Sequence, residues 1–117
     1  MNKCTIIGNL TRDPETRQTK SGDVTQLSVA VNRRDGEADF FRVSCWGKLG
    51  ENCAKYLSKG KKVCAVGPVS ASAYETQDGD IRASLDIFAE SVEFLSPADH
   101  ADDDKPQNSR RDSNRRR

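Results

Sequence analysis

FFRVSCWGK, residues 40–48, carries two different patterns on its alternate positions. Alternate side chains of a β-strand face the same way, so one face would hold Phe41, Val43 and Cys45. The second face would hold Phe40, Arg42, Ser44 and Trp46. Aromatic rings beside a guanidinium are suited to stacking on unpaired bases, because every base has a π-face and the nucleic-acid backbone is anionic. A two-faced core strand with a stray arginine is an equally good interpretation of this segment alone.

The segments before residue 40 extend the β pattern. Residues 3–7 form a short β-rich run, and residues 24–32 alternate with their aliphatic side chains on one side. Asp35-Gly36 predicts a hairpin turn between residues 24–32 and the aromatic strand. The polar stretch from residue 11 to residue 23 is interpreted as turns, because it contains Asp-Pro and Ser-Gly-Asp signals.

The segments after residue 48 predict a helix and two further strands. Leu49, Cys53 and Leu57 repeat every four residues, so a helix is predicted from residue 49 to residue 58, with Gly60 as its C-terminal cap. Residues 63–74 and 81–92 are predicted strands joined by a hairpin turn. Pro68 cannot donate a ladder hydrogen bond, so a bulge or an edge position is expected there.

This order of elements predicts an all-β OB-fold. Three strands, one short helix and two strands correspond to a five-stranded OB-fold barrel, with the helix between strands 3 and 4. OB-folds bind oligonucleotides on the face of strands 2 and 3, which favours stacking by the aromatic strand. The barrel is expected at residues 1–97. Residues 98–117 contain no aliphatic or aromatic residue beyond two alanines and are expected to form a disordered charged tail.

Composition narrows the classes of function. The net charge is only +1, and residues 1–97 hold 13 basic and 13 acidic side chains, so a nucleic-acid face would need a local concentration of basic groups. There is no apolar signal segment and no stretch long enough to span a bilayer. We therefore expect a cytoplasmic protein with reduced cysteines and no membrane partner.

Catalysis and metal binding are both disfavoured by the sequence. The four cysteines form no C-x-x-C pair, and the single histidine, His100, lies in a polar region. Residues 1–97 hold no histidine that could activate a serine or cysteine nucleophile. Asp78 and Asp80 lie in a predicted turn, where aspartates bond to the local backbone. We expect no enzymatic activity, no cofactor and no metal site.

Several short runs match one known family in order and spacing. They are residues 8–15 (GNLTRDPE), 40–43 (FFRV), 46–49 (WGKL), 56–57 (YL), 59–60 (KG) and 77–79 (QDG). Together they resemble bacterial single-stranded DNA-binding proteins over roughly residues 1–95. The resemblance implies an OB-fold homotetramer that wraps unpaired DNA in the cytosol or nucleoid, during replication, recombination and repair.

The resemblance also implies roles for eight residues. It places Phe40, Trp46 and Tyr74 at base-stacking positions, although Trp46 could be a core residue and Tyr74 an ordinary hairpin aromatic. It places Arg42, Lys48 and Lys59 at basic positions near the DNA, and Arg33 and Arg34 in a hairpin whose counterpart touches DNA.

Two departures from the family pattern leave part of its function open. The hairpin at residues 33–37 has no aromatic side chain, which some relatives use for stacking. The family tail usually ends in an acidic run followed by Pro-Phe, which recruits replication and repair proteins, whereas residues 102–106 (DDDKP) lack the phenylalanine. Two alternative functions are a protein-interaction accessory subunit that has lost DNA binding and a single-stranded RNA binder, since only contacts to the 2′-OH distinguish the two nucleic acids.

Overall fold

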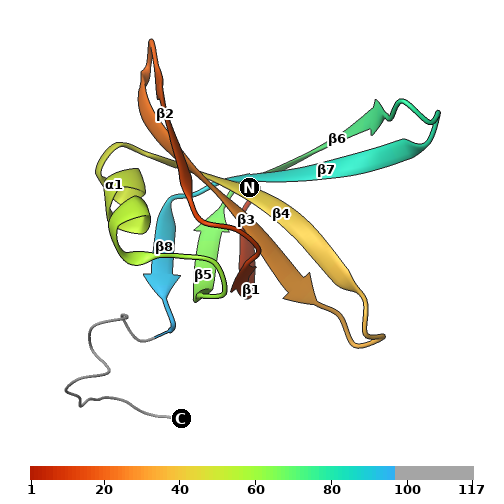
Figure 1. Ribbon diagram of the computed structural model, residues 1–117, viewed down its shortest axis with the longest axis horizontal. Helices are drawn as coiled ribbons and strands as arrows, with labels where there is room; N and C mark the ends of the chain where they lie inside the picture. The colour runs from red at the N-terminus through yellow and green to blue at the C-terminus, as the bar shows by residue number, and fades with distance from the viewer. Residues whose placement is uncertain (97–117) are drawn as a thin grey trace.

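Residues 1–96 are described by the computed structural model, and they form strands around one short helix (Figure 1). The tail expected at residues 98–117 lies outside the described residues. The elements are β1 (Cys4–Leu10), β2 (Glu15–Thr19), β3 (Gly22–Asn32), β4 (Ala38–Trp46), α1 (Gly47–Tyr56), β5 (Lys62–Gly67), β6 (Val69–Glu75), β7 (Ile81–Phe88) and β8 (Ser91–Phe94).

Two of the five predicted strands are each bent into two segments. β5 and β6 meet at Pro68, which confirms the predicted interruption, since proline has no N–H for the ladder. β6 pairs with β7 and β5 pairs with β8, both antiparallel. The ladder continues across the bend, because Phe88 N–H donates to Pro68 O (3.0 Å) and Glu90 N–H donates to Val66 O (2.7 Å). The last two predicted strands are therefore one long bent hairpin.

The sheet order is β6-β7-β4-β3-β1-β5-β8, in which β4 and β7 run parallel and the other pairs along this path are antiparallel. The two halves of the bent hairpin lie at opposite ends of this order, so the sheet curls back on itself. With one helix after the third predicted strand, this arrangement confirms the expected OB-fold.

One strand was missed by the sequence analysis. β2 lies in the stretch that was interpreted as turns, and it pairs with β3 from Glu15↔Gln26 to Thr19↔Gly22. All five residues of β2 are exposed, so the segment carries no apolar alternation that could reveal a strand. β2 and the first half of β3 project from the body as a hairpin (Figure 1).

The core lies where the apolar faces of β3 and β4 meet β1, β5 and β7. Leu27, Val29, Val43, Cys45 and Ile87 are completely buried, which confirms the predicted alternation of these strands. One residue differs from its expected face. Ser44 is buried (8% exposed) because β7 bends into β8 beside it, where Ala89 N–H donates to Ser44 O. At the outer end of β7 the core no longer covers the strand, and Ile81 is 68% exposed there.

The helix is shifted by two residues from its predicted range. It begins at Gly47 and ends at Tyr56, with Leu57 as the C-cap. Leu57 is extended and buried, so the chain leaves the helix in order to insert this side chain into the core. Gly60 is not the cap. It has a φ of +93° in the following turn, where its N–H donates to Leu10 O at 2.9 Å.

No helix within residues 1–96 is both long and apolar enough to cross a bilayer.

Gly50 sets the distance between α1 and β4. A Cβ at this position would lie 2.4 Å from the carbonyl oxygen of Cys45 and 2.9 Å from Thr25 Oγ1. The missing side chain therefore lets the helix pack directly on the end of β4, beside Trp46.

Gly50→Ala is expected to destabilise the fold. Helix propensity alone would favour alanine by about 1 kcal/mol, but forced overpacking costs about 1–3 kcal/mol and the contact is with backbone. Urea unfolding at one fixed protein concentration measures the change. Ala54→Gly, at an exposed position of the same helix, is the control and should lose only the propensity difference. A Gly50→Ala protein as stable as the parent would show that the helix can move away at no cost.

Candidate nucleic-acid interface

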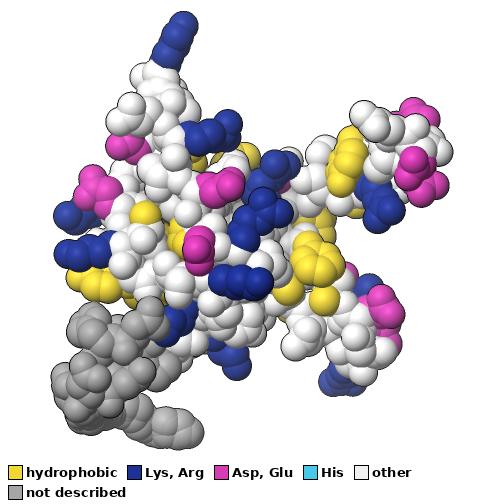
Figure 2. Space-filling model, in the orientation of Figure 1, with side chains coloured by type: hydrophobic (Ala, Val, Ile, Leu, Met, Phe, Trp, Pro, Cys, Tyr) yellow, Lys and Arg dark blue, Asp and Glu magenta, His cyan; other side chains and the backbone are white. Residues whose placement is uncertain are grey.

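An open groove of about 890 Å³ crosses the outer face of β4. One wall comes from β6 and β7, and the other comes from β3 and the connection between β1 and β2. β6 and β7 form a projecting hairpin, the β6–β7 arm (Figure 1). In Figure 2, hydrophobic side chains and Lys and Arg side chains both gather on this face, near the place where the β6–β7 arm joins the body. The side chains that line the groove include those of Arg12, Glu15, Phe40, Arg42, Tyr74 and Ser84.

Phe40 and Tyr74 place two exposed aromatic rings in this groove. Phe40 is 65% exposed on β4 and Tyr74 is 53% exposed on β6, although the two residues lie on strands that do not pair with each other. A core strand would bury such rings, so the two-faced core interpretation of residues 40–48 is wrong for Phe40. The groove brings together three of the predicted site residues, Phe40, Arg42 and Tyr74.

Trp46 and Lys48 form a second location, at the junction of β4 and α1. Trp46 is 43% exposed, which rules out the core alternative, but it does not line the groove. It lies six residues beyond Phe40 on the same strand, roughly 20 Å away, and it is the N-cap residue of α1. Lys48 follows in the first turn, with its Nζ 3.7 Å from Glu51 Oε1.

Arg42 is held in place by two residues of β7. Its Nε donates to Asp86 Oδ1 at 2.7 Å and its Nη2 donates to Ser84 Oγ at 3.2 Å. The Arg42 side chain is still 53% exposed, whereas that of Asp86 is 24% exposed. Arg42 therefore reaches the groove as a guanidinium that is already partly paired.

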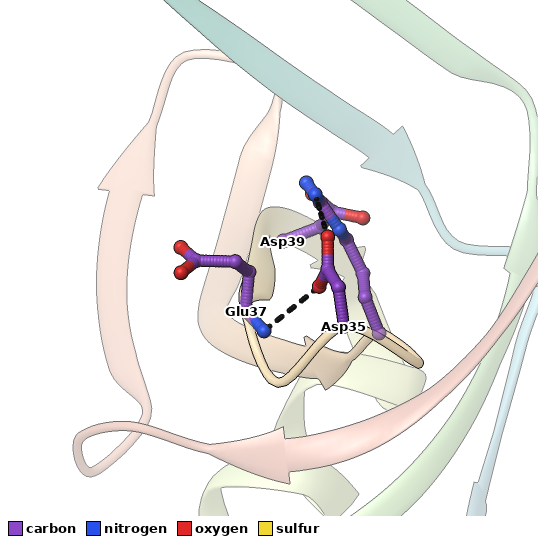
Figure 3. A network of polar contacts seen from close by, with 4 residues as sticks. Asp35, Glu37 and Asp39 are labelled. Atoms are coloured by element: carbon purple, nitrogen blue, oxygen red, sulfur yellow. Dashed lines mark hydrogen bonds and ion pairs between the residues drawn. The ribbon is translucent and has the colours of Figure 1, made fainter.

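Arg33 is engaged within its own hairpin. Its guanidinium bonds to the carboxylates of Asp35 and Asp39, and Glu37 N–H donates to Asp35 Oδ1 at 2.9 Å (Figure 3). The hydrogen bond from Arg33, followed by that from the Glu37 backbone, lowers the pKa of Asp35. The hydrogen bonds that Arg33 donates to Asp35 and then to Asp39 raise the pKa of Arg33. This network holds the turn together and leaves the Arg33 charge largely satisfied.

Two other predicted basic residues stand apart from the groove. Arg34 is exposed beside Arg33 and makes no ion pair within residues 1–96. Lys59 is exposed in the turn after α1, where its backbone N–H donates to Asp13 Oδ1 at 2.8 Å. Neither residue lines the groove, so the structure does not bring the five predicted basic residues into one patch.

Two charged residues of the groove were not predicted as site residues. Arg12 is exposed, lines the groove and makes no ion pair in the part of the chain that the structure describes. Glu15 lies in the same wall and brings a negative charge to it. The signal for Arg12 in the sequence is its place in residues 8–15, one of the runs that resemble the family, although the local turn residues around it indicate only a turn.

Comparison with known proteins gives a consistent family. Residues 1–95 match the single-strand binding protein family. A single-stranded DNA-binding protein of Clostridium perfringens is 41% identical over 99 residues, which cover 81% of this chain and 66% of that protein. Single-stranded DNA-binding protein 2 of Listeria innocua is 36% identical over 121 residues, covering 97% and 76% of the two chains.

A solved structure agrees with these relatives. The crystal structure of the small single-stranded DNA-binding protein from Streptomyces coelicolor superposes with a TM-score of 0.70 at 25% identity, covering 80% of this chain and 95% of that one. The chain spans slightly less than two thirds of the Clostridium perfringens protein. From the match of residues 1–95 and the identities of these relatives, the chain belongs to the single-strand binding protein family.

Proposed function

We propose that this chain binds single-stranded DNA without sequence preference and protects unpaired DNA during replication, recombination and repair. Membership of the family supports DNA binding. The observation that carries the proposal is the groove itself, whose lining includes the exposed rings of Phe40 and Tyr74 and the guanidinium of Arg42. Stacking on aromatic rings tolerates any base, and this explains binding without a sequence-reading element.

The DNA path has two parts in this proposal. Bases stack on Phe40 and Tyr74 in the groove, and the strand then continues along β4 to Trp46 and Lys48. Arg12, Arg34 and Lys59 add phosphate contacts at the margins. This is a binding function without catalysis, carried by a single domain at residues 1–97 in the bacterial cytosol or nucleoid.

One of the two alternatives is weaker on physical grounds, and the other needs a separate test. A protein-interaction subunit that had lost DNA binding would have no need for separate exposed aromatics beside basic groups, and family membership does not favour it. A single-stranded RNA binder would use the same stacking on aromatic rings. Parallel binding titrations with dT and rU oligonucleotides therefore distinguish a DNA binder from an RNA binder.

Substitution of the groove aromatics is expected to weaken binding. Phe40→Ala and Tyr74→Ala should each cost about 1–3 kcal/mol of binding free energy, nearly equally for different base sequences. Trp46 emission should be quenched when DNA is added, because a base stacks on the ring. Fluorescence titration with dT oligonucleotides measures both effects. Tyr56→Ala, an exposed aromatic outside the groove, is the control. Trp46 emission that does not change at saturating DNA would remove Trp46 from the binding face.

The two hairpin arginines are expected to differ. Arg34→Ala should weaken binding and make the log–log salt dependence shallower by about 0.7 if one phosphate contact is lost. Arg33→Ala loses the same charge, so the long-range field changes equally, but it removes no direct contact and should have the smaller effect.

The Arg33→Ala protein also tests the carboxylate network. The pKa of Asp35 should rise toward its ordinary value, because its first hydrogen-bond donor is gone. A lowered pKa means that the ionised carboxylate supports the hairpin above the unfolded-state pKa and that this support is lost as pH falls. NMR titration of the Asp35 carboxyl measures the shift. A larger loss of DNA affinity in Arg33→Ala than in Arg34→Ala would assign the direct contact to Arg33.

We also propose that the protein assembles as a homotetramer. Ile7 is 53% exposed on β1 directly opposite Cys64 on β5, so the outer face of the β1–β5 pair carries apolar groups that a neighbouring subunit would cover. Closed symmetric assemblies are the usual form of soluble oligomers. Recruitment of replication and repair proteins through residues 102–106 stays an open proposal, since these residues lie outside those described.

Ile7→Asp is expected to reduce the size of the assembly, because a buried unpaired carboxylate is strongly disfavoured at an interface. Light scattering at micromolar concentration should give a tetramer mass for the parent and a smaller mass for the variant. Gln18→Asp, on exposed β2, is the charge-matched control and should leave the mass unchanged. A monomer mass for the parent would refute the tetramer.

A further inference from the structure

We propose that Asp86 is a positioning residue for DNA binding, which orients the Arg42 guanidinium toward the groove before DNA arrives. This inference rests on the proposed function. A carboxylate beside a DNA-binding groove would ordinarily repel phosphates, so its presence next to the central arginine of the face calls for a physical reason.

The sheet register places the two residues side by side. β4 and β7 pair in parallel with Arg42 directly opposite Asp86, so both side chains leave the sheet on the same face. Ser84 lies two residues earlier on β7 and points the same way. Ser84 Oγ lies 3.2 Å from Asp86 Oδ2 and 3.2 Å from Arg42 Nη2. With the 2.7 Å bond from Arg42 Nε to Asp86 Oδ1, the three residues form a closed ring of hydrogen bonds.

Burial keeps the Asp86 carboxylate out of the lining of the groove. Arg42 and Ser84 line the groove, whereas Asp86 does not. Its side chain is the most buried member of the ion pairs found within residues 1–96, at 24% exposed. Arg42 therefore presents its positive charge to the groove, whereas the carboxylate that is bonded to it does not line the groove.

The hydrogen-bond inventory shows what this arrangement leaves available. A guanidinium has five N–H donors in a fixed plane. Asp86 and Ser84 use one on Nε and one on Nη2, which leaves both donors of Nη1 and one of Nη2. Because the bonds to β7 fix the plane, the remaining donors form a prepositioned fork, which is the geometry that matches phosphate oxygens. The side-chain freedom of Arg42 is already restricted before binding.

Glu15 provides an internal comparison. It also brings a carboxylate to the groove, but it lines the groove directly and makes no ion pair among the described residues. If proximity to DNA were all that mattered, Asp86 and Glu15 would both simply weaken binding. The positioning role instead predicts that the effect of Asp86 depends on whether Arg42 is present.

The test is a double-mutant cycle on the full chain. Asp86→Asn keeps the shape but loses the charge-assisted bond, so it should weaken binding about three- to tenfold when Arg42 is present. In the Arg42→Ala protein the same change should tighten binding, because it removes a carboxylate that nothing covers. Glu15→Gln is the matched control and should tighten binding in both backgrounds. The readout is fluorescence anisotropy of a labelled dT oligonucleotide at two salt concentrations, which does not depend on Trp46.

A second measurement needs no DNA. In the parent protein the Arg42 Nε–H should give a resolved, slowly exchanging NMR signal, and Asp86→Asn and Ser84→Ala should each speed its exchange. Ser84→Ala should also weaken DNA binding, though less than Asp86→Asn does. If the Asp86→Asn protein fails to fold, Ser84→Ala tests the positioning of Arg42 in its place.

The possible outcomes are distinct. Tightening by Asp86→Asn in both backgrounds, as for Glu15→Gln, would show that Asp86 only lowers the charge of the groove and would overturn the inference. Equal binding with and without the change would overturn it too, as would a fast-exchanging Arg42 Nε–H in the parent. A parent protein that does not bind dT at all would refute the proposed function itself, and the NMR signal would still report whether Asp86 holds Arg42.

Discussion

The pairing of β3 with β4 is the constraint on which the rest of the structure depends. The two strands align over nine residue pairs, from Val24↔Trp46 to Asn32↔Ala38. Because side chains alternate with a period of two, a slip of one residue would turn the buried Val43 outward and the exposed Phe40 into the core. One register therefore fixes both the barrel interior and the candidate binding face. The helix that follows β4 is then held against it at Gly50.

The candidate binding face is built at the margins of a small core. Tyr74 comes from an arm whose outer part contributes little to the core, since all of β6 except its first residue is exposed. β4 contributes side chains both to the core and to the groove. β7 does the same, with Ile87 in the core and Ser84 in the groove. The groove is thus positioned by strands whose other faces or ends are locked in the core. This gives rigid placement to Phe40 and Tyr74, which stay exposed although contact of their rings with water is unfavourable.

Carboxylates hold two of the arginine side chains of this protein in place. Arg42 is oriented by Asp86 across two strands, whereas Arg33 is held by Asp35 and Asp39 within one hairpin. Arg42 lines the groove, whereas Arg33 lies outside it. With the body near neutrality, attraction at long range is weak. In the proposed function, stacking in the groove and a few well-placed donors therefore supply most of the affinity for DNA.

Local patterns in the sequence were enough to determine the alternation of β3 and β4, both hairpin turns, the break at Pro68 and the OB-fold order, since each depends on neighbouring residues. They missed β2, whose exposed residues carry no periodic signal, and they misplaced the helix ends, because burial of Leu57 overrides the local cap. Only the tertiary structure placed Tyr74 in one groove with Phe40, and Asp86 against Arg42. The physical reason is that these contacts join strands 34 to 44 positions apart in the chain, and their geometry depends on how the sheet curls rather than on either segment alone.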